Sequence, residues 1–166
     1  MGATTKKLLT AQLIRELGRK AAAVPRRRTN HNFHESPDDP IQRLVIVMQK
    51  GTYIRPHRHA AENKWEFAVA LQGRMQVILL NDDGIVMERV DLAPGGRNIG
   101  LEIPSEAWHT WLALDEDAAF FECKRGPYHP EKTTTFAPWS PPEGDSRVAE
   151  YSQWLACAKV GEKFLH

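Results

Sequence analysis

The hydrophobic positions change their period near residue 41. Before that point, Leu9, Leu13 and Leu17 recur at every fourth position, which predicts an amphipathic helix over residues 5–22. After it, apolar residues gather in short runs of strand length, several with alternating polar positions. In chain order the runs are IQRLVIVMQ, TYIRPHRH, KWEFAVALQ, RMQVILLN, IVMERVDL, RNIGLEIP, AWHTWLAL and DAAFFECKR.

Turn-forming residues separate these runs. The segment Asn81-Asp82-Asp83-Gly84, placed between two hydrophobic runs, is the clearest hairpin signal. No helical pattern intervenes between the runs, so the pattern predicts an all-β fold, either an antiparallel barrel or a two-sheet jelly roll.

The flanking segments differ from the strand region. Residues 26–40 are polar and contain two prolines, which predicts a loop or an irregular extended segment, and the RRR run within it is read as a solvated charge cluster. The stretch GPYHPEKTTTFAPWSPPEGD predicts an ordered strap across the barrel, followed by a short helix over residues 146–160. We expect one structural domain: a helical segment at 1–25, the barrel with its loops at 26–144, and a helical tail at 145–166.

Charge and cysteine content narrow the function classes. The 166 residues hold 22 Lys and Arg against 21 Asp and Glu, and a net charge of +1 gives no reason to expect a nucleic-acid or membrane partner. The sequence shows neither a secretory signal pattern nor an apolar run long enough to span a bilayer. Its two cysteines, Cys123 and Cys157, read as ordinary thiols. A cytoplasmic protein is expected.

Two histidines stand out in the segment GTYIRPHRHAAENKWEF. Alternate side chains of a strand share a face, so His57 and His59 point the same way. On the next run, Glu66 shares its face with Ala68 and Ala70, which predicts a carboxylate pointing into a cavity kept open by small residues. Glu62 is a competing carboxylate that the sequence leaves open.

A third histidine, His109, follows a proline turn at the start of a later strand. Three imidazoles and a carboxylate suit one divalent first-row metal, and the ligand set of His57, His59, Glu66 and His109 fits Fe, Mn, Ni, Zn or Co alike.

Charged groups near this set are candidates for ligand binding. Arg55 has the strand parity of His57, so its guanidinium would need either an acidic partner such as Glu122 or an anionic ligand. Arg43, if it also points inward, would add a second anion-binding group. Lys124 shares a face with Glu122, and two inward charges are costly unless they are paired or used.

Two aromatic residues complete the candidates. Tyr53 has the parity of His57 and could act as an acid or a hydrogen-bond donor, and Glu122 could also move a proton. Trp111 has the parity of His109, and its face would suit a sugar ring, although ordinary barrel packing is the favoured interpretation.

These motifs carry a family resemblance. The spacing of Gly51, His57, His59, Glu66 and Gly73 is similar to the first motif of the cupin superfamily, and Pro104, Glu106 and His109 resemble its second. Three departures are a longer gap between His59 and Glu66, a glutamate at position 106, where glycine is usual, and the lack of an asparagine at the usual position after His109. With the flanking segments included, residues 26–144 resemble the WbuC family of cupin-fold metalloproteins.

That resemblance implies a cupin barrel, a bound metal and a sugar or nucleotide-sugar ligand connected with O-antigen or other surface-polysaccharide biosynthesis. Lewis-acid isomerase or epimerase chemistry is one expectation. A non-catalytic binding module and an iron-dependent dioxygenase are the alternatives. A homodimer is expected from the architecture.

Overall fold

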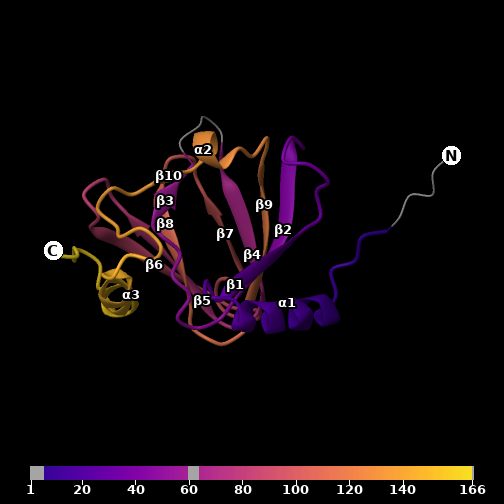
Figure 1. The fold of residues 1–166 in the computed structure, drawn as a ribbon, viewed down its shortest axis with the longest axis horizontal. Helices are drawn as coiled ribbons and strands as arrows, with labels where there is room; N and C mark the ends of the chain where they lie inside the picture. Colours follow the sequence, from indigo (N-terminus) through magenta and orange to yellow (C-terminus); the bar gives the residue numbers. More distant parts are fainter. Residues whose placement is uncertain (1–5, 60–63, 166) are drawn as a thin grey trace.

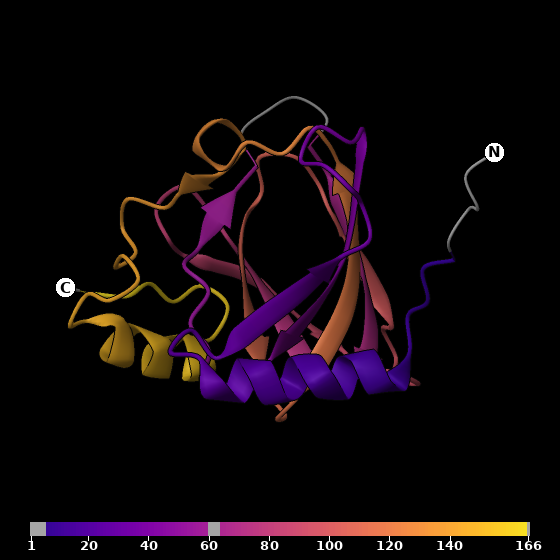
Figure 2. The same ribbon diagram turned by 45° about the vertical axis from the view of Figure 1, so that its right-hand side comes forward.

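The computed structural model describes residues 6–59 and 64–165. In this part of the chain, two five-stranded sheets with antiparallel pairing face each other (Figures 1 and 2), which confirms the expected all-β fold. The first sheet has the order β1 (Arg28–Asn32), β2 (Ile41–Met48), β9 (Ala118–Arg125), β4 (Glu66–Gln72) and β7 (Gly100–Ile103). The second has the order β10 (Thr135–Phe136), β3 (His57–Arg58), β8 (Trp108–Ala113), β5 (Met75–Leu80) and β6 (Val86–Leu92).

The core between the sheets comes from the alternation that the sequence displays. On β4, Glu66, Ala68 and Ala70 are buried, whereas Phe67 on the opposite face is 40% exposed. Deeper in the interior, the rings of Trp111 and Phe120 stack at a centroid distance of 4.2 Å and an interplanar angle of 5°. The interior between the sheets is therefore apolar around Trp111 and Phe120, a region that we call the apolar floor, and its polar side chains lie toward the other end of the barrel.

Helix α1 (Ala11–Ala23) lies across the lower ends of the strands in Figure 2 and packs on part of the outer face of the first sheet. Thr10 caps it by accepting a hydrogen bond from the Leu13 amide, so the helix begins at residue 11 and not at residue 5. Its buried residues Ile14 and Leu17 pack with Val45 and Val47 of β2. Because β2 is covered on both faces, its apolar run is nearly continuous.

The C-terminal strap runs along one edge of the second sheet. Its strand β10 pairs with β3 and is preceded by the short helix α2 (Pro130–Thr133). Helix α3 (Val148–Cys157), which is shorter than the predicted 146–160, packs Tyr151 and Leu155 against the outer side of that sheet. No helix in the described part of the chain is both long and apolar enough to cross a lipid bilayer.

Two local predictions are corrected. Only His57–Arg58 of the run TYIRPHRH forms a strand, because Pro56 lacks the amide that a continuous ladder would need. Conversely, the polar segment 26–40 contains β1, which pairs along β2 from Arg28↔Met48 to Asn32↔Leu44. Backbone pairing at a sheet edge does not require apolar side chains, so the polar composition concealed this strand.

Candidate metal centre

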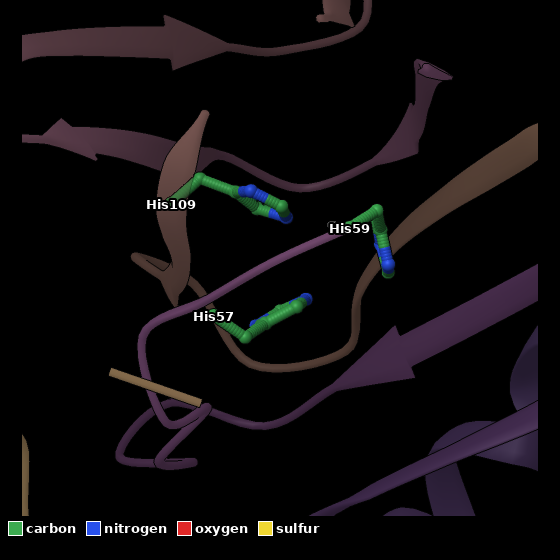
Figure 3. Close-up of side chains that lie close together, drawn as sticks. All are labelled: His57, His59 and His109. Atoms are coloured by element: carbon green, nitrogen blue, oxygen red, sulfur yellow. The ribbon is translucent and has the colours of Figure 1, made fainter. Parts of the chain in front are cut away.

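Three imidazoles converge on one another, from β3, from the residue after it and from β8 (Figure 3). His57 on β3 lies directly opposite His109 on β8, and His59 follows β3 by one residue. One ligating nitrogen from each ring lies within 4.8 Å of the others. The expected convergence of these histidines is confirmed.

The backbone fixes the orientation of each ring. The Nδ1 atoms of His57, His59 and His109 lie 3.0, 3.2 and 2.9 Å from the carbonyl oxygens of Arg55, Thr133 and Ala107. A carbonyl only accepts, so each Nδ1 carries the proton and each neutral ring presents the lone pair of Nε2. Metal-binding histidines commonly have this arrangement, because a bond at one nitrogen aims the other at the ion.

The turn before β8 supports the same geometry. The Glu106 amide donates to the carbonyl of His59 at 3.1 Å, which ties His59 to the turn that leads to His109. Glu106 has a φ of 66°, in the left-handed region that glycine adopts freely. The glutamate therefore keeps the backbone conformation that explains why glycine is usual here in the motif.

Glu66 joins the cluster from β4. Its Oε2 lies 3.0 Å from Nε2 of His59 and its Oε1 lies 3.1 Å from Nε2 of His109, and the side chain is 2% exposed. Glu62, the competing carboxylate, lies outside the described residues. Among the described carboxylates, Glu66 is the one in ion-pair range of these rings.

The close approach of the Glu66 oxygens to the Nε2 atoms of His59 and His109 requires a proton or a metal ion between them. With Nδ1 protonated on each ring, Nε2 lone pairs face the Glu66 carboxylate, and an acceptor placed 3 Å from an acceptor is repulsive unless a proton or metal lies between them. Two of these atoms, Nε2 of His109 and Oε1 of Glu66, are buried and make no well-aligned hydrogen bond within the described structure. Buried polar atoms are rarely left unsatisfied, so this donor set fits a metal ion.

Burial and charge shift the titration of the cluster in opposite directions. Burial lowers the pKa of His57 far below its usual value, and the neighbouring His109 lowers it further, so the ring stays neutral as a ligand must. Burial alone would raise the pKa of Glu66, but the positive charge of a protonated His109, whose Nε2 can donate to Glu66 when no metal lies between them, and a bond from Nε2 of His59 hold it well below the ordinary range. Burial lowers the pKa of His109, but the negative charge and the hydrogen bonding of Glu66 together have the larger effect, so the net pKa of His109 is raised.

A buried ion pair stands beside the cluster. The ammonium of Lys124 lies 2.7 Å from Oε1 of Glu122 and 4.0 Å from Oε2 of Glu66. Burial raises the pKa of Glu122, while Glu122 and Glu66 raise that of Lys124 against its own desolvation. The inward orientation expected for Glu122 and Lys124 holds, and they form an ion pair, although Oε1 of Glu122 makes no well-aligned hydrogen bond within the described structure.

A cavity of about 160 Å³ opens next to the histidines. His57, His59 and Lys124 line it together with Arg55, whose guanidinium lies 5.2 Å above the Phe136 ring of the strap. Arg55 donates to the Ser140 hydroxyl and the Ala137 carbonyl, so its partners are strap atoms and not Glu122. In the described part of the chain it forms no ion pair, which leaves its charge available to a ligand.

Three expected site residues lie elsewhere. Arg43 is on the outer face of β2 beside Cys123 and pairs with Asp39 at 3.5 Å, because its strand parity points it away from the interior. Tyr53 donates its hydroxyl to the Pro141 carbonyl at 2.8 Å and packs on Tyr151, outside the barrel. Trp111 is buried on Phe120, so it belongs to the apolar floor and does not face the cavity.

The sequence interpretation missed three charged residues that line the cavity. Arg26 and Arg28, read as part of a solvated run, both line it, as does Glu143 of the strap. Arg28 is 13% exposed at its side chain and bonds to Glu143 and to the Tyr53 carbonyl. The resemblance of residues 26–28 to a family segment was the available signal, but the strand that directs Arg28 inward was not predicted.

Comparison with known proteins identifies the family. A family model described as a domain of unknown function (DUF6016) matches residues 9–92. The chain belongs to this family. No curated protein matches the sequence.

Solved structures show the fold of this DUF6016 chain. Oxalate oxidase in complex with the substrate analogue glycolate aligns with a TM-score of 0.52 and 15% identity, over 70% of this chain and 58% of that one. The DMSP lyase DddQ from Ruegeria pomeroyi DSS-3 aligns with a TM-score of 0.52 and 19% identity, over 71% and 54%. KdgF from Halomonas sp. aligns with a TM-score of 0.49 and 19% identity, over 65% and 86%. The chain spans little more than half the length of the oxalate oxidase and DddQ chains. The alignment with these two structures confirms the predicted cupin-type jelly roll.

Proposed function

We propose that this DUF6016 protein is a metal-dependent enzyme that acts on a small anionic, sugar-related metabolite. His57, His59, His109 and Glu66 would hold one divalent first-row metal ion. The observation that carries the proposal is the convergence of these four acceptor groups, two of which, His57 and His59, line a cavity together with four cationic side chains.

The cavity supports an anionic ligand. Its cationic side chains are Arg26, Arg28, Arg55 and Lys124, whereas Glu143 is the acidic side chain along the described lining apart from the metal ligands. A metal bound beside it would supply Lewis-acid polarisation of a carbonyl or hydroxyl oxygen. Arg55 would bind one anionic group of the ligand, and the rings of Phe136 and Tyr128 would pack against the ligand body.

Glu122 is the proposed proton-transfer residue. It is 4% exposed and its pKa is raised by burial, so it holds a proton more readily than an ordinary glutamate does. Lys124 lies between Glu122 and Glu66 and positions both carboxylates. Isomerisation or epimerisation of a sugar needs a proton to be moved next to a polarised carbonyl, which matches this arrangement.

The finer assignment to the WbuC family and to surface-polysaccharide biosynthesis rests on the sequence resemblance of residues 26–144. It supplies the sugar or nucleotide sugar as substrate class, and it remains part of the proposal. A homodimer remains a prediction.

The experiment is an activity screen with a binding control. Metal-loaded protein is incubated with a panel of sugar acids, sugar phosphates and nucleotide sugars, and products are detected by mass spectrometry. Turnover that His109→Ala abolishes supports the enzyme. Saturable binding without turnover would replace it with a non-catalytic module, and oxygen consumption with iron would indicate a dioxygenase.

A further inference from the structure

The cavity next to the histidines holds an arginine pair with a carboxylate already between the two side chains. We propose that Arg26 and Arg28 form an anion-binding subsite of this cavity, that Glu143 occupies the subsite in the ligand-free protein, and that the anionic group of the ligand displaces Glu143. The inference rests on the proposed function only in taking the ligand of the cavity to be an anion.

The contacts around Glu143 are those of a bound anion. Nε and Nη2 of Arg26 donate to its two carboxylate oxygens at 2.8 and 3.0 Å, and Nη2 of Arg28 donates to Oε1. Such forked contacts are how arginine recognises carboxylates and phosphates. One carboxylate here serves two guanidinium groups, so the subsite retains an excess positive charge that a dianion would neutralise more fully.

The backbone holds the two arginines in place from the protein side. Arg27 between them has a φ of 53°, a conformation that is uncommon for a residue other than glycine. The Arg26 carbonyl accepts from the Thr52 hydroxyl at 2.7 Å, and the Arg27 carbonyl accepts from the Gln49 amide at 2.9 Å. These bonds do not involve the strap, so the arginine pair is built independently of Glu143.

Arg28 in particular is suited to hold a ligand. It is 13% exposed at the side chain, and its Nη1 donates to the Tyr53 carbonyl at 2.8 Å. A guanidinium fixed at one edge loses little conformational freedom when an anion binds its other edge. It lines the same cavity as His57 and His59, which places the subsite within the space of one ligand.

Glu143 has room to leave. Its side chain is 37% exposed, and it also borders a second cavity, of about 300 Å³, which Arg26 and Arg28 line as well. The next residue, Gly144, has a φ of 88° and open space around the position of a Cβ atom. The strap can therefore turn at this point while the Tyr53 hydroxyl still holds Pro141.

The pocket beyond the subsite indicates the shape of the ligand. A cavity of about 270 Å³ shares Arg26, Arg28, Lys124 and Tyr128 with the first, and β1 adds the amide side chains of Asn30 and Asn32. Amide groups bind hydroxyls without a charge requirement. The structure thus assigns a ligand class: a polyhydroxylated molecule that carries a phosphate or a second carboxylate.

The test uses inorganic phosphate as the probe and the full chain in both metal-loaded and metal-stripped form. Binding is measured by isothermal titration calorimetry for the wild type, Glu143→Gln, Arg28→Gln and the charge-matched control Glu150→Gln, which alters an exposed residue of α3. If Glu143 fills the subsite about nine-tenths of the time, its neutralisation tightens phosphate binding about tenfold. We expect no change for Glu150→Gln and loss of binding for Arg28→Gln, with both metal states alike.

Several results would overturn the inference. These are unchanged or weaker phosphate binding by Glu143→Gln, full binding by Arg28→Gln, or no binding by Glu143→Gln at all. Should Arg28→Gln fail to fold, Arg28→Lys replaces it and is expected to weaken binding, because it keeps the charge and loses the fork. Failure of the protein to bind metal, with the Glu143→Gln effect intact, would refute the proposed function and leave the subsite standing.

Discussion

Replacement of Glu66 by glutamine tests the fourth metal ligand at nearly constant volume. The carboxylate is 2% exposed and lies 3.0 and 3.1 Å from Nε2 of His59 and His109. Glutamine keeps the shape and one oxygen acceptor but removes the negative charge. Zinc serves as the probe, because its preferred ligands in proteins are imidazole, thiolate and carboxylate.

The expected loss follows from the burial of the site. Removing one charge of a buried ionic contact costs about 3–5 kcal/mol, and each 1.4 kcal/mol changes an equilibrium constant about tenfold. Zinc affinity should therefore fall by roughly two to three and a half orders of magnitude. Zinc at about 1,000 times the wild-type Kd should stabilise the wild type by about 4.1 kcal/mol, which corresponds to roughly 8–16 °C for a domain of this size.

Calorimetric titration and thermal unfolding with and without zinc measure both quantities. At the same zinc concentration the variant should gain roughly 6 °C or less. Glu102→Gln is the matched control: it alters charge equally on the neighbouring strand β7, at an exposed position. Wild-type affinity in Glu66→Gln, or an equal loss in Glu102→Gln, would refute the assignment of Glu66 as a ligand.

Three further predictions follow from buried and charged contacts. Lys124→Met leaves Glu122 without its partner, so we expect the free energy of unfolding to fall by about 3–5 kcal/mol. The loss should grow as the pH rises, because the pKa of Glu122 is already raised by burial and ionising the unpaired carboxyl inside the protein is costly. Urea unfolding measures this loss, and the double variant with Glu122→Gln should recover part of it. Glu143→Gln tests the contact between the strap and the arginine pair. Burial raises the pKa of Glu143, but the hydrogen bonds from Arg26 and Arg28 lower it by more, so the net pKa in the folded protein is lowered. The contribution of Glu143 to stability is therefore present above about pH 4.5 and is lost as the pH falls through the lowered folded-state pKa. The stability difference between wild type and Glu143→Gln should therefore shrink below pH 4.5, and a constant difference from pH 3 to 7 would contradict this. Trp111→Ala removes the stack on Phe120 and should cost about 3–5 kcal/mol without change in zinc affinity, whereas a loss of zinc binding by a folded variant would mean that Trp111 belongs to the site.

Strand periodicity carried the prediction of the metal cluster. The two-residue spacing of His57 and His59, and the alternation of Glu66 with alanines, required only that side chains of a strand alternate. That rule failed for residues 52–56, where Pro56 interrupts the ladder, and Tyr53 consequently lies outside the barrel. It also left open which face of β2 is inward, because both faces of that strand are covered, and Arg43, a candidate only if it pointed inward, lies on the outer face.

The cavity lining could not be predicted from sequence because it depends on contacts between distant segments. Arg28 reaches the cavity only because β1 pairs with β2. Glu143, its hydrogen-bond partner, lies 115 residues further along the chain. A run of three arginines has the same local pattern whether it is solvated or inward-facing. The choice is decided by the tertiary structure.

The most direct measurement is X-ray absorption at the metal edge of the protein loaded with one equivalent of zinc, for the wild type and for His109→Ala. We expect one tightly held ion per chain with a scattering pattern of three imidazoles and one oxygen ligand, reduced to two imidazoles in the variant. A wild-type spectrum with fewer than three imidazoles, or a protein that retains no zinc after dialysis, would contradict the proposal that His57, His59 and His109 share one metal ion.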